Sequence, residues 1–123
     1  MAHRAADALN REDWDTFIEL LDPEVEFRSL IAEADGDTFH GHEGARQWWD
    51  TVRGAFGSVN WDYQEVRSDE NRAVLKVTIG GTIRGVPVNQ TMWQALEIRD
   101  GKALWWTFFR SEEEAEQAVA ERT

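Results

Sequence analysis

The chain of 123 residues contains no cysteine, which excludes disulfides, thiolate chemistry and cysteine-based metal sites. Basic residues are scarce: 13 lysines and arginines stand against 24 aspartates and glutamates, for a formal net charge of -11. Such a charge repels phosphate backbones and anionic lipid surfaces. Neither a nucleic acid nor a membrane is therefore expected as a partner.

Long apolar runs are also missing from the chain. No window approaches ~18 uninterrupted apolar residues, and the first residues, Met-Ala-His-Arg-Ala-Ala-Asp, lack an apolar signal core. A cytoplasmic location is the expectation that follows. Linkers rich in serine or proline, internal repeats and low-complexity runs are absent too. Residues 1–123 are thus predicted to form a single domain, and no cofactor is expected.

Tryptophan is abundant by contrast. The chain has seven, and four of them form the adjacent pairs Trp48-Trp49 and Trp105-Trp106. Each indole can bury roughly 200 Å² of surface. Seven indoles imply a large aromatic interior, an apolar cavity or a buried contact between subunits.

Helical periodicity predicts three helices before the strand-rich part of the chain and one after it. The first is short and covers residues 2–9, and the second has Asp13 as its N-cap and stops before Pro23. A last helix begins at Ser111 and has three acids in its first turn. Apolar residues recur at helical spacing at Trp14, Phe17, Ile18 and Leu21 in the second helix and at Ala45, Trp48, Trp49, Val52 and Phe56 in the third.

Alternating apolar and polar residues predict one strand early in the chain and four later ones. The acidic, glycine-containing stretch 32–41 is predicted to be a loop, and short turns between the later strands indicate an antiparallel meander. The predicted strands are 25–31, 59–66, 73–84, 88–98 and 104–110. Helices come first and the sheet follows, so the fold class is α+β.

Several polar residues fall on strand rows that face the core. Ser29, Gln90, Gln94 and Arg110 alternate with aromatic and aliphatic neighbours, and burying a polar group without a partner costs about 1–3 kcal/mol. These four side chains either satisfy one another in a closed core or line a cavity that holds water or a ligand. A mostly apolar pocket with a few polar groups is the usual form of a small-molecule site.

The opposite row of the last strands is aromatic as well. A sheet face in contact with water would not need Trp93, Trp105 and Phe109. This row is expected to pack on a second copy of the chain in a homodimer. The alternative is coverage by the C-terminal helix alone.

Three segments together resemble the SnoaL-like family of the nuclear transport factor 2-like superfamily. They are Leu-Asp-Pro-Glu-Val-Glu-Phe-Arg-Ser, the Gly-His-Glu-Gly opening of the third helix, and Arg-Asp-Gly-Lys followed by an aromatic strand. The resemblance spans nearly the whole chain. It implies a ketosteroid isomerase-like fold, in which a curved antiparallel sheet wraps around N-terminal helices as a cone with an internal cavity, often as a dimer.

The resemblance does not identify a reaction, because members include ketosteroid isomerases, polyketide cyclases, limonene epoxide hydrolases, dehydratases and binding modules. The positions that carry the isomerase's base, tyrosine and second aspartate fall on Ser29, near Ala5 and near Gln94. All three chemical groups are absent. The inward rows of the last three strands also lack the carboxylates that the hydrolase and the cyclase require.

His40 and His42 are the remaining candidates for chemistry, with Glu33, Asp35 and Asp37 upstream. Histidine titrates near neutral pH and serves as a base or a metal ligand. The pattern is unspecific: His42 at a helix start more often caps or packs, and the acids are most simply a solvated loop. His40, His42 and Asp35 are kept as weak catalytic candidates, and no metal is assigned.

The leading hypothesis is a pocket protein that binds a small, largely apolar or aromatic molecule, with no reaction assigned. Gln94 and Ser29 would bond a carbonyl or hydroxyl, and Arg110 would hold a carboxylate or phenolate at the rim. The alternatives are an isomerase, dehydratase or hydrolase with a histidine or loop acid as its base, and a dimerisation module without catalysis. The predicted ligand-binding residues are Phe27, Ser29, Trp48, Trp49, Met92, Gln94, Trp106, Phe108 and Arg110, and the predicted dimer contacts are Trp93, Trp105 and Phe109.

Overall fold

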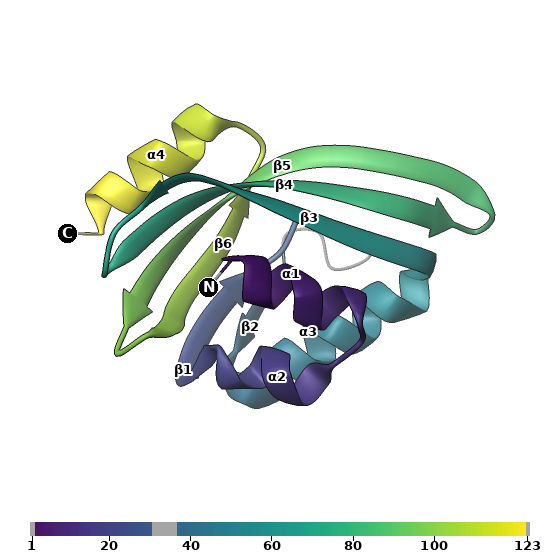
Figure 1. Ribbon diagram of the computed structural model, residues 1–123, viewed down its shortest axis with the longest axis horizontal. Helices are drawn as coiled ribbons and strands as arrows, with labels where there is room; N and C mark the ends of the chain where they lie inside the picture. Colours follow the sequence, from purple (N-terminus) through teal and green to yellow (C-terminus); the bar gives the residue numbers. More distant parts are fainter. Residues whose placement is uncertain (1, 31–36, 123) are drawn as a thin grey trace.

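A computed structural model describes residues 2–30 and 37–122 of the chain, and they form an α+β fold. Helices α1 (Ala2–Asn10), α2 (Trp14–Glu19) and α3 (Gly41–Ala55) lie on one side of a six-stranded sheet, and α4 (Glu112–Glu121) lies on the other (Figure 1). The strands are β1 (Leu21–Arg28), β2 (Thr38–His40), β3 (Phe56–Ser68), β4 (Arg72–Ile83), β5 (Val86–Arg99) and β6 (Lys102–Phe109). The predicted class is confirmed.

The sheet is curved and unclosed, with the strand order β2-β1-β6-β5-β4-β3 (Figure 1). Strands β3 to β6 form the predicted antiparallel meander. The prediction of a wholly antiparallel sheet is wrong at one place, because β1 pairs with β6 in parallel. Periodicity reports which face a residue occupies but not which strand lies beside it, and a parallel pair needs the long crossover that the rest of the chain supplies.

Two boundaries near β1 differ from those predicted. The strand begins at Leu21 rather than Val25, because the sheet already holds the backbone there: Ala103 N donates to Leu20 O at 2.8 Å. Pro23 is tolerated within β1 since the ladder to β6 is irregular between Leu21 and Glu26. The predicted loop 32–41 contains β2, which was missed because three residues are too few to show an alternation.

The inner face of the sheet, which looks toward α1, α2 and α3, carries the main hydrophobic core. Helix α3 presents Trp48, Trp49 and Val52 to it on one stripe, as predicted. The outer face carries a smaller core, in which Ala115 and Val119 of α4 pack over Trp105. The sheet therefore has apolar cover on both faces. Among the described helices, none is long and apolar enough to span a membrane.

Candidate functional site

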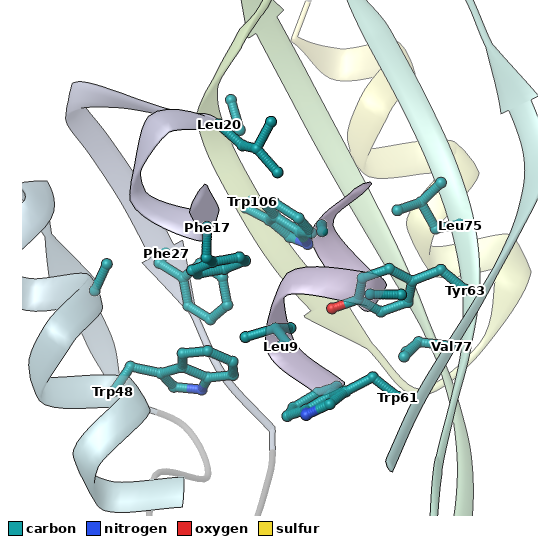
Figure 2. Packing of buried hydrophobic residues seen from close by; sticks show 14 of the residues in the cluster. Leu9, Phe17, Leu20, Phe27, Trp48, Trp61, Tyr63, Leu75, Val77 and Trp106 are labelled. Carbon is teal, nitrogen blue, oxygen red and sulfur yellow. The ribbon is translucent and has the colours of Figure 1, made fainter. Parts of the chain in front are cut away.

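Seven aromatic side chains meet on the inner face and form what we call the aromatic cluster. Figure 2 shows rings from helices and strands pointing toward one centre. The ring centroid of Phe27 lies 4.6 Å from that of Trp48 and 5.8 Å from that of Trp106. Tyr63 lies 6.2 Å from Trp106. These are the separations of favourable tilted ring pairs. The cluster consists of Phe17, Phe27, Trp48, Trp61, Tyr63, Trp106 and Phe108, all nearly fully buried.

Gln94 is the polar centre of this cluster and is 0% exposed. Its Oε1 accepts a 2.7 Å hydrogen bond from Trp106 Nε1. An indole nitrogen can only donate, so this bond fixes the amide orientation and directs Nε2 away from Trp106. Gln94 Nε2 makes no hydrogen bond of good geometry among the residues that the structure describes, although it lies near enough to the Tyr63 hydroxyl to lower the pKa of that phenol. A buried donor in this state costs about 1–3 kcal/mol, which an acceptor atom placed beside it would recover.

Ser29, the other buried polar residue predicted for the pocket, is 0% exposed. Its Oγ accepts a 3.1 Å hydrogen bond from Trp48 Nε1. Ser29 and Gln94 are thus each bonded to a tryptophan rather than to one another. The alternation of the predicted strands correctly placed both side chains inward. It did not indicate that tryptophan indoles donate to them.

Tyr63 belongs to the same cluster and was not predicted as a site residue. Burial raises the pKa of its phenol well above the ordinary value of 10.0, and the adjacent Gln94 side chain lowers it by a smaller amount. The phenol therefore stays protonated at neutral pH and presents an O–H donor. The alternation of Val59, Trp61 and Tyr63 in β3 placed this hydroxyl on the inner row, and that was the available signal.

Most residues predicted to bind the ligand lie in the buried interior, and two lie at its margin. Met92 is nearly buried, whereas Arg110 is exposed because β6 ends at Phe109 and Arg110 continues beyond the ladder. Both line a hollow of about 260 Å³ together with Gln90 and Thr91, which we call the rim hollow. Gln90 shares the inner row with Gln94, but it is exposed at this open end. The predicted ligand residues therefore fall into two groups, a buried aromatic interior and a polar rim at its margin.

The histidine candidates lie at the junction of β2 and α3, with His40 ending the strand and His42 in the first turn of the helix. His40 is exposed at the end of β2, and the ring Nε2 of His42 lies 2.8 Å from Leu21 O. Asp35 and Glu33 lie outside the described residues. In the part of the chain that is described, no group of three or more histidine or acidic side chains is arranged to hold a metal ion.

Asp22 is the one buried carboxylate in the described ranges, and it is already paired. Its oxygens accept from Glu24 N at 2.8 Å and from Arg99 Nη2 at 3.1 Å. The Glu24 backbone bond is the main cause that lowers the pKa of Asp22, with Arg99 adding to it. Asp22 is therefore an ionised anchor between β1 and β5. The described interior offers donors to a ligand oxygen but no general base.

The predicted dimer residues of the outer face divide into two groups. Trp105 is covered by α4, and Arg122 stacks over its ring with the guanidinium carbon 4.3 Å from the centroid. Trp93 and Phe109 are only half-buried beside this patch. The C-terminal helix thus supplies the cover for Trp105, and only the other two remain available to a second chain.

Comparison with known proteins agrees with this geometry. A family model described as a SnoaL-like domain matches residues 2–106. No curated protein matches the chain.

Among solved structures, a protein described as a putative polyketide cyclase from Sinorhizobium meliloti is 21% identical, with a TM-score of 0.70 over 85% of this chain and 89% of that one. TerC, co-crystallized with polyporic acid, is 19% identical with a TM-score of 0.77 over 96% and 94%. A Catenulispora acidiphila protein with a ketosteroid isomerase-like fold, in complex with trimethylamine, is 16% identical with a TM-score of 0.74 over 96% and 90%. At these identities the likeness shows the fold.

Proposed function

The chain belongs to the SnoaL-like domain family, and from that premise we propose that it binds a small, largely apolar or aromatic molecule at the aromatic cluster. One observation carries the proposal: the amide nitrogen of Gln94 is buried at 0% exposure and lacks a partner among the described residues. A ligand carbonyl or hydroxyl oxygen accepts from Gln94 Nε2, and the surrounding rings contact the ligand's apolar body.

The rim hollow extends the proposal to the ligand's outer end. Arg110 and Met92 lie there together, so a carboxylate or phenolate meets the guanidinium while the methionine contacts apolar surface. TerC with polyporic acid and the Catenulispora protein with trimethylamine support the idea that this fold accommodates small organic molecules. We assign no reaction, since a proton-transfer mechanism requires a base within hydrogen-bond reach of the substrate.

Tryptophan fluorescence tests the proposal directly. A panel of steroids, phenols and polyketide-like aromatics is titrated into the protein and into the variant Gln94→Leu. We expect at least one compound to bind, with an affinity that falls about tenfold in Gln94→Leu. A hydrogen bond between neutral groups contributes about 1.5 kcal/mol at most, which corresponds to that factor. The matched control is Gln64→Leu, at an exposed glutamine of β3 outside the rim hollow, which should bind as the wild type does. Absence of binding across the whole panel would refute the proposal.

We also propose that the chain forms a homodimer through the outer face beside α4, with Trp93 and Phe109 at the contact. Two half-buried aromatic rings side by side on a sheet face favour a partner surface. Sedimentation velocity at micromolar concentration tests this. A monomer throughout, or a dimer unaffected by Trp93→Ser, would contradict it.

A further inference from the structure

A hollow of about 230 Å³ lies at the ends of β1 and β6, on the β1 side of Arg110. We call it the arginine hollow. The rim hollow lies on the other side of β6, because its remaining residues belong to β5. A cavity of about 150 Å³ holds a benzene ring, so the arginine hollow accommodates one ring with a small substituent. Its lining consists of Arg28, Leu30, Phe108, Phe109, Arg110 and Glu114.

The parallel pairing of β1 with β6 forms this hollow. Parallel neighbours run in the same direction, so their carboxyl ends meet at the same edge of the sheet. Arg28 is the last residue of β1, and it pairs with Thr107 close to the end of β6. Two guanidinium groups that are far apart in the sequence, those of Arg28 and Arg110, therefore border one hollow.

The uncharged part of the lining is apolar. Phe108 is 2% exposed and belongs to the aromatic cluster, where its ring centroid lies 5.8 Å from that of Phe27. Leu30 and Phe109 are half-buried. Apolar walls with a few charged groups at the edge are typical of a site that holds an apolar body by contact and orients it by one polar end.

The lining carries a formal charge of +1, from two guanidinium groups and the Glu114 carboxylate, in a chain whose net charge is -11. Glu114 Oε1 accepts a 3.1 Å hydrogen bond from Ser111 Oγ, which holds this carboxylate at the start of α4. In residues 2–30 and 37–122, Arg28 forms no ion pair with an acid, including Glu26 on its own strand face and Asp37 just before β2. The arginine hollow therefore favours an anion.

We propose that the arginine hollow binds a small aromatic carboxylate, with its carboxylate group between the guanidinium groups of Arg28 and Arg110 and its ring against Phe108. A guanidinium binds a carboxylate through short, charge-assisted hydrogen bonds. The site goes beyond the proposed function, because it lies on the β1 side of β6 and Gln94 takes no part in it. The anionic charge is the one that the proposed function also gives to a ligand at Arg110.

Three probes test the ligand class on the wild-type protein: benzoate, benzamide and acetate. Two-dimensional NMR follows the Nε–H signals of Arg28 and Arg110, assigned by their loss in Arg28→Gln and Arg110→Gln. Benzoate is expected to shift both signals and to bind about tenfold more tightly than benzamide, which lacks the charge, or acetate, which lacks the ring. Equal binding of benzoate and benzamide, tighter binding of acetate, or an unshifted Arg28 signal would overturn the inference.

Variants that each remove one charge test the lining. Arg28→Gln is expected to weaken benzoate binding about tenfold, because hydrogen bonds to a charged group are lost. Glu114→Gln is expected to strengthen it about threefold, since a like charge is removed while glutamine keeps the capping interaction with Ser111. Thermal unfolding confirms that each variant is folded.

The control for these variants is Arg4→Gln, at an exposed arginine of α1, which packs on β3 at the opposite edge of the sheet. Distant exposed charges are screened at about 0.15 M salt, so Arg4→Gln should change benzoate binding by less than about twofold. Equal losses in Arg4→Gln and Arg28→Gln would show that only the net charge matters, and would overturn the inference.

The two proposals fail in different ways. If benzoate binding is lost in Arg110→Gln but unchanged in Arg28→Gln, the carboxylate lies in the rim hollow, and the proposed function stands without this inference. If benzoate shifts both arginine signals while no compound of the fluorescence panel binds, the proposed function falls and the arginine hollow stands.

Discussion

Two buried polar side chains in this protein accept hydrogen bonds from tryptophan indoles. A buried indole must donate its N–H or lose the bond it had with water. Trp48 and Trp106 meet that need with Ser29 Oγ and Gln94 Oε1. Ser29 and Gln94, which interrupt the aromatic rows, are therefore acceptors for the core itself. Within the cluster, Gln94 Nε2 and Trp61 Nε1 are buried without a hydrogen-bond partner among the described residues.

The phenol of Tyr63 gives a prediction for alkaline pH. Its pKa in the folded state is raised above 10.0, so the neutral phenol contributes stability that is fully present below pH 10.0 and is lost as the pH rises further. Tyr63 is the single tyrosine, so ultraviolet absorbance of tyrosinate reports it alone. We expect the folded protein to ionise well above the urea-unfolded protein, and Tyr63→Phe to lose less stability at alkaline pH. Titration of the native protein at its ordinary value would contradict this.

Among the elements, α1 and β3 are joined by one asparagine. Asn10 Nδ2 donates to Trp61 O at 2.8 Å, and Trp61 N donates to Asn10 Oδ1 at 2.7 Å. The amide thus occupies the place of a neighbouring strand on β3, which is the sheet edge. It both positions the helix and satisfies backbone groups that flank Trp61.

Replacing this asparagine is expected to loosen the helix from the sheet. Asn10→Ala should lower the free energy of unfolding by about 2 kcal/mol, because two hydrogen bonds contribute roughly 0.5–1.5 kcal/mol each. Urea unfolding followed by tryptophan fluorescence measures the change. Asn89→Ala, at an exposed asparagine of β5, is the control and should stay within about 0.5 kcal/mol of the wild type. An equal loss of unfolding free energy in the two variants would show that Asn10 does not hold α1 against β3.

Elements with a clear period were predictable from the sequence, and elements defined by pairing were not. The stripe of Trp48, Trp49 and Val52 predicted α3. Ser111 predicted the start of α4, where its Oγ accepts a hydrogen bond from Glu114 N. Strand β2 has only three residues, and its identity comes from pairing with β1. The cover of Trp105 by α4 likewise depends on how the helix returns across the sheet.

At the scale of the whole molecule, net charge governs the proposed dimer. Two copies carry a formal charge of -11 each, and their repulsion extends about 30 Å at 0.01 M salt but about 8 Å at 0.15 M. The dimerisation constant is expected to strengthen several-fold across that range, as measured by sedimentation velocity. Trp93→Ser should remain monomeric at both salt concentrations. A dimer that weakens as salt is added would instead indicate attractive ion pairs across the interface.

The candidate site was partly predictable at the same scale. Row assignments placed Gln94, Ser29 and Trp106 inward, because alternation fixes the face of a strand residue. The row assignments did not show that β6 ends at Phe109, which leaves Arg110 and the Gln90 end of β5 exposed. The end of a strand depends on its pairing, which the alternation does not report. Tyr63 was overlooked because a tyrosine among tryptophans looks like packing until its burial is known.

The parallel pairing of β1 with β6 constrains when the protein can fold. Leu21 pairs with Ala103 and Phe27 with Trp106, so strands from opposite parts of the chain must meet. Contacts between residues far apart in the sequence slow folding, because the entropy cost of closing a long loop comes before the contacts can form. On the ribosome, Phe27 and Trp48 are synthesised long before Trp106 arrives. Until then the Phe27 ring lacks its Trp106 neighbour, and the pair of β1 with β6 cannot form.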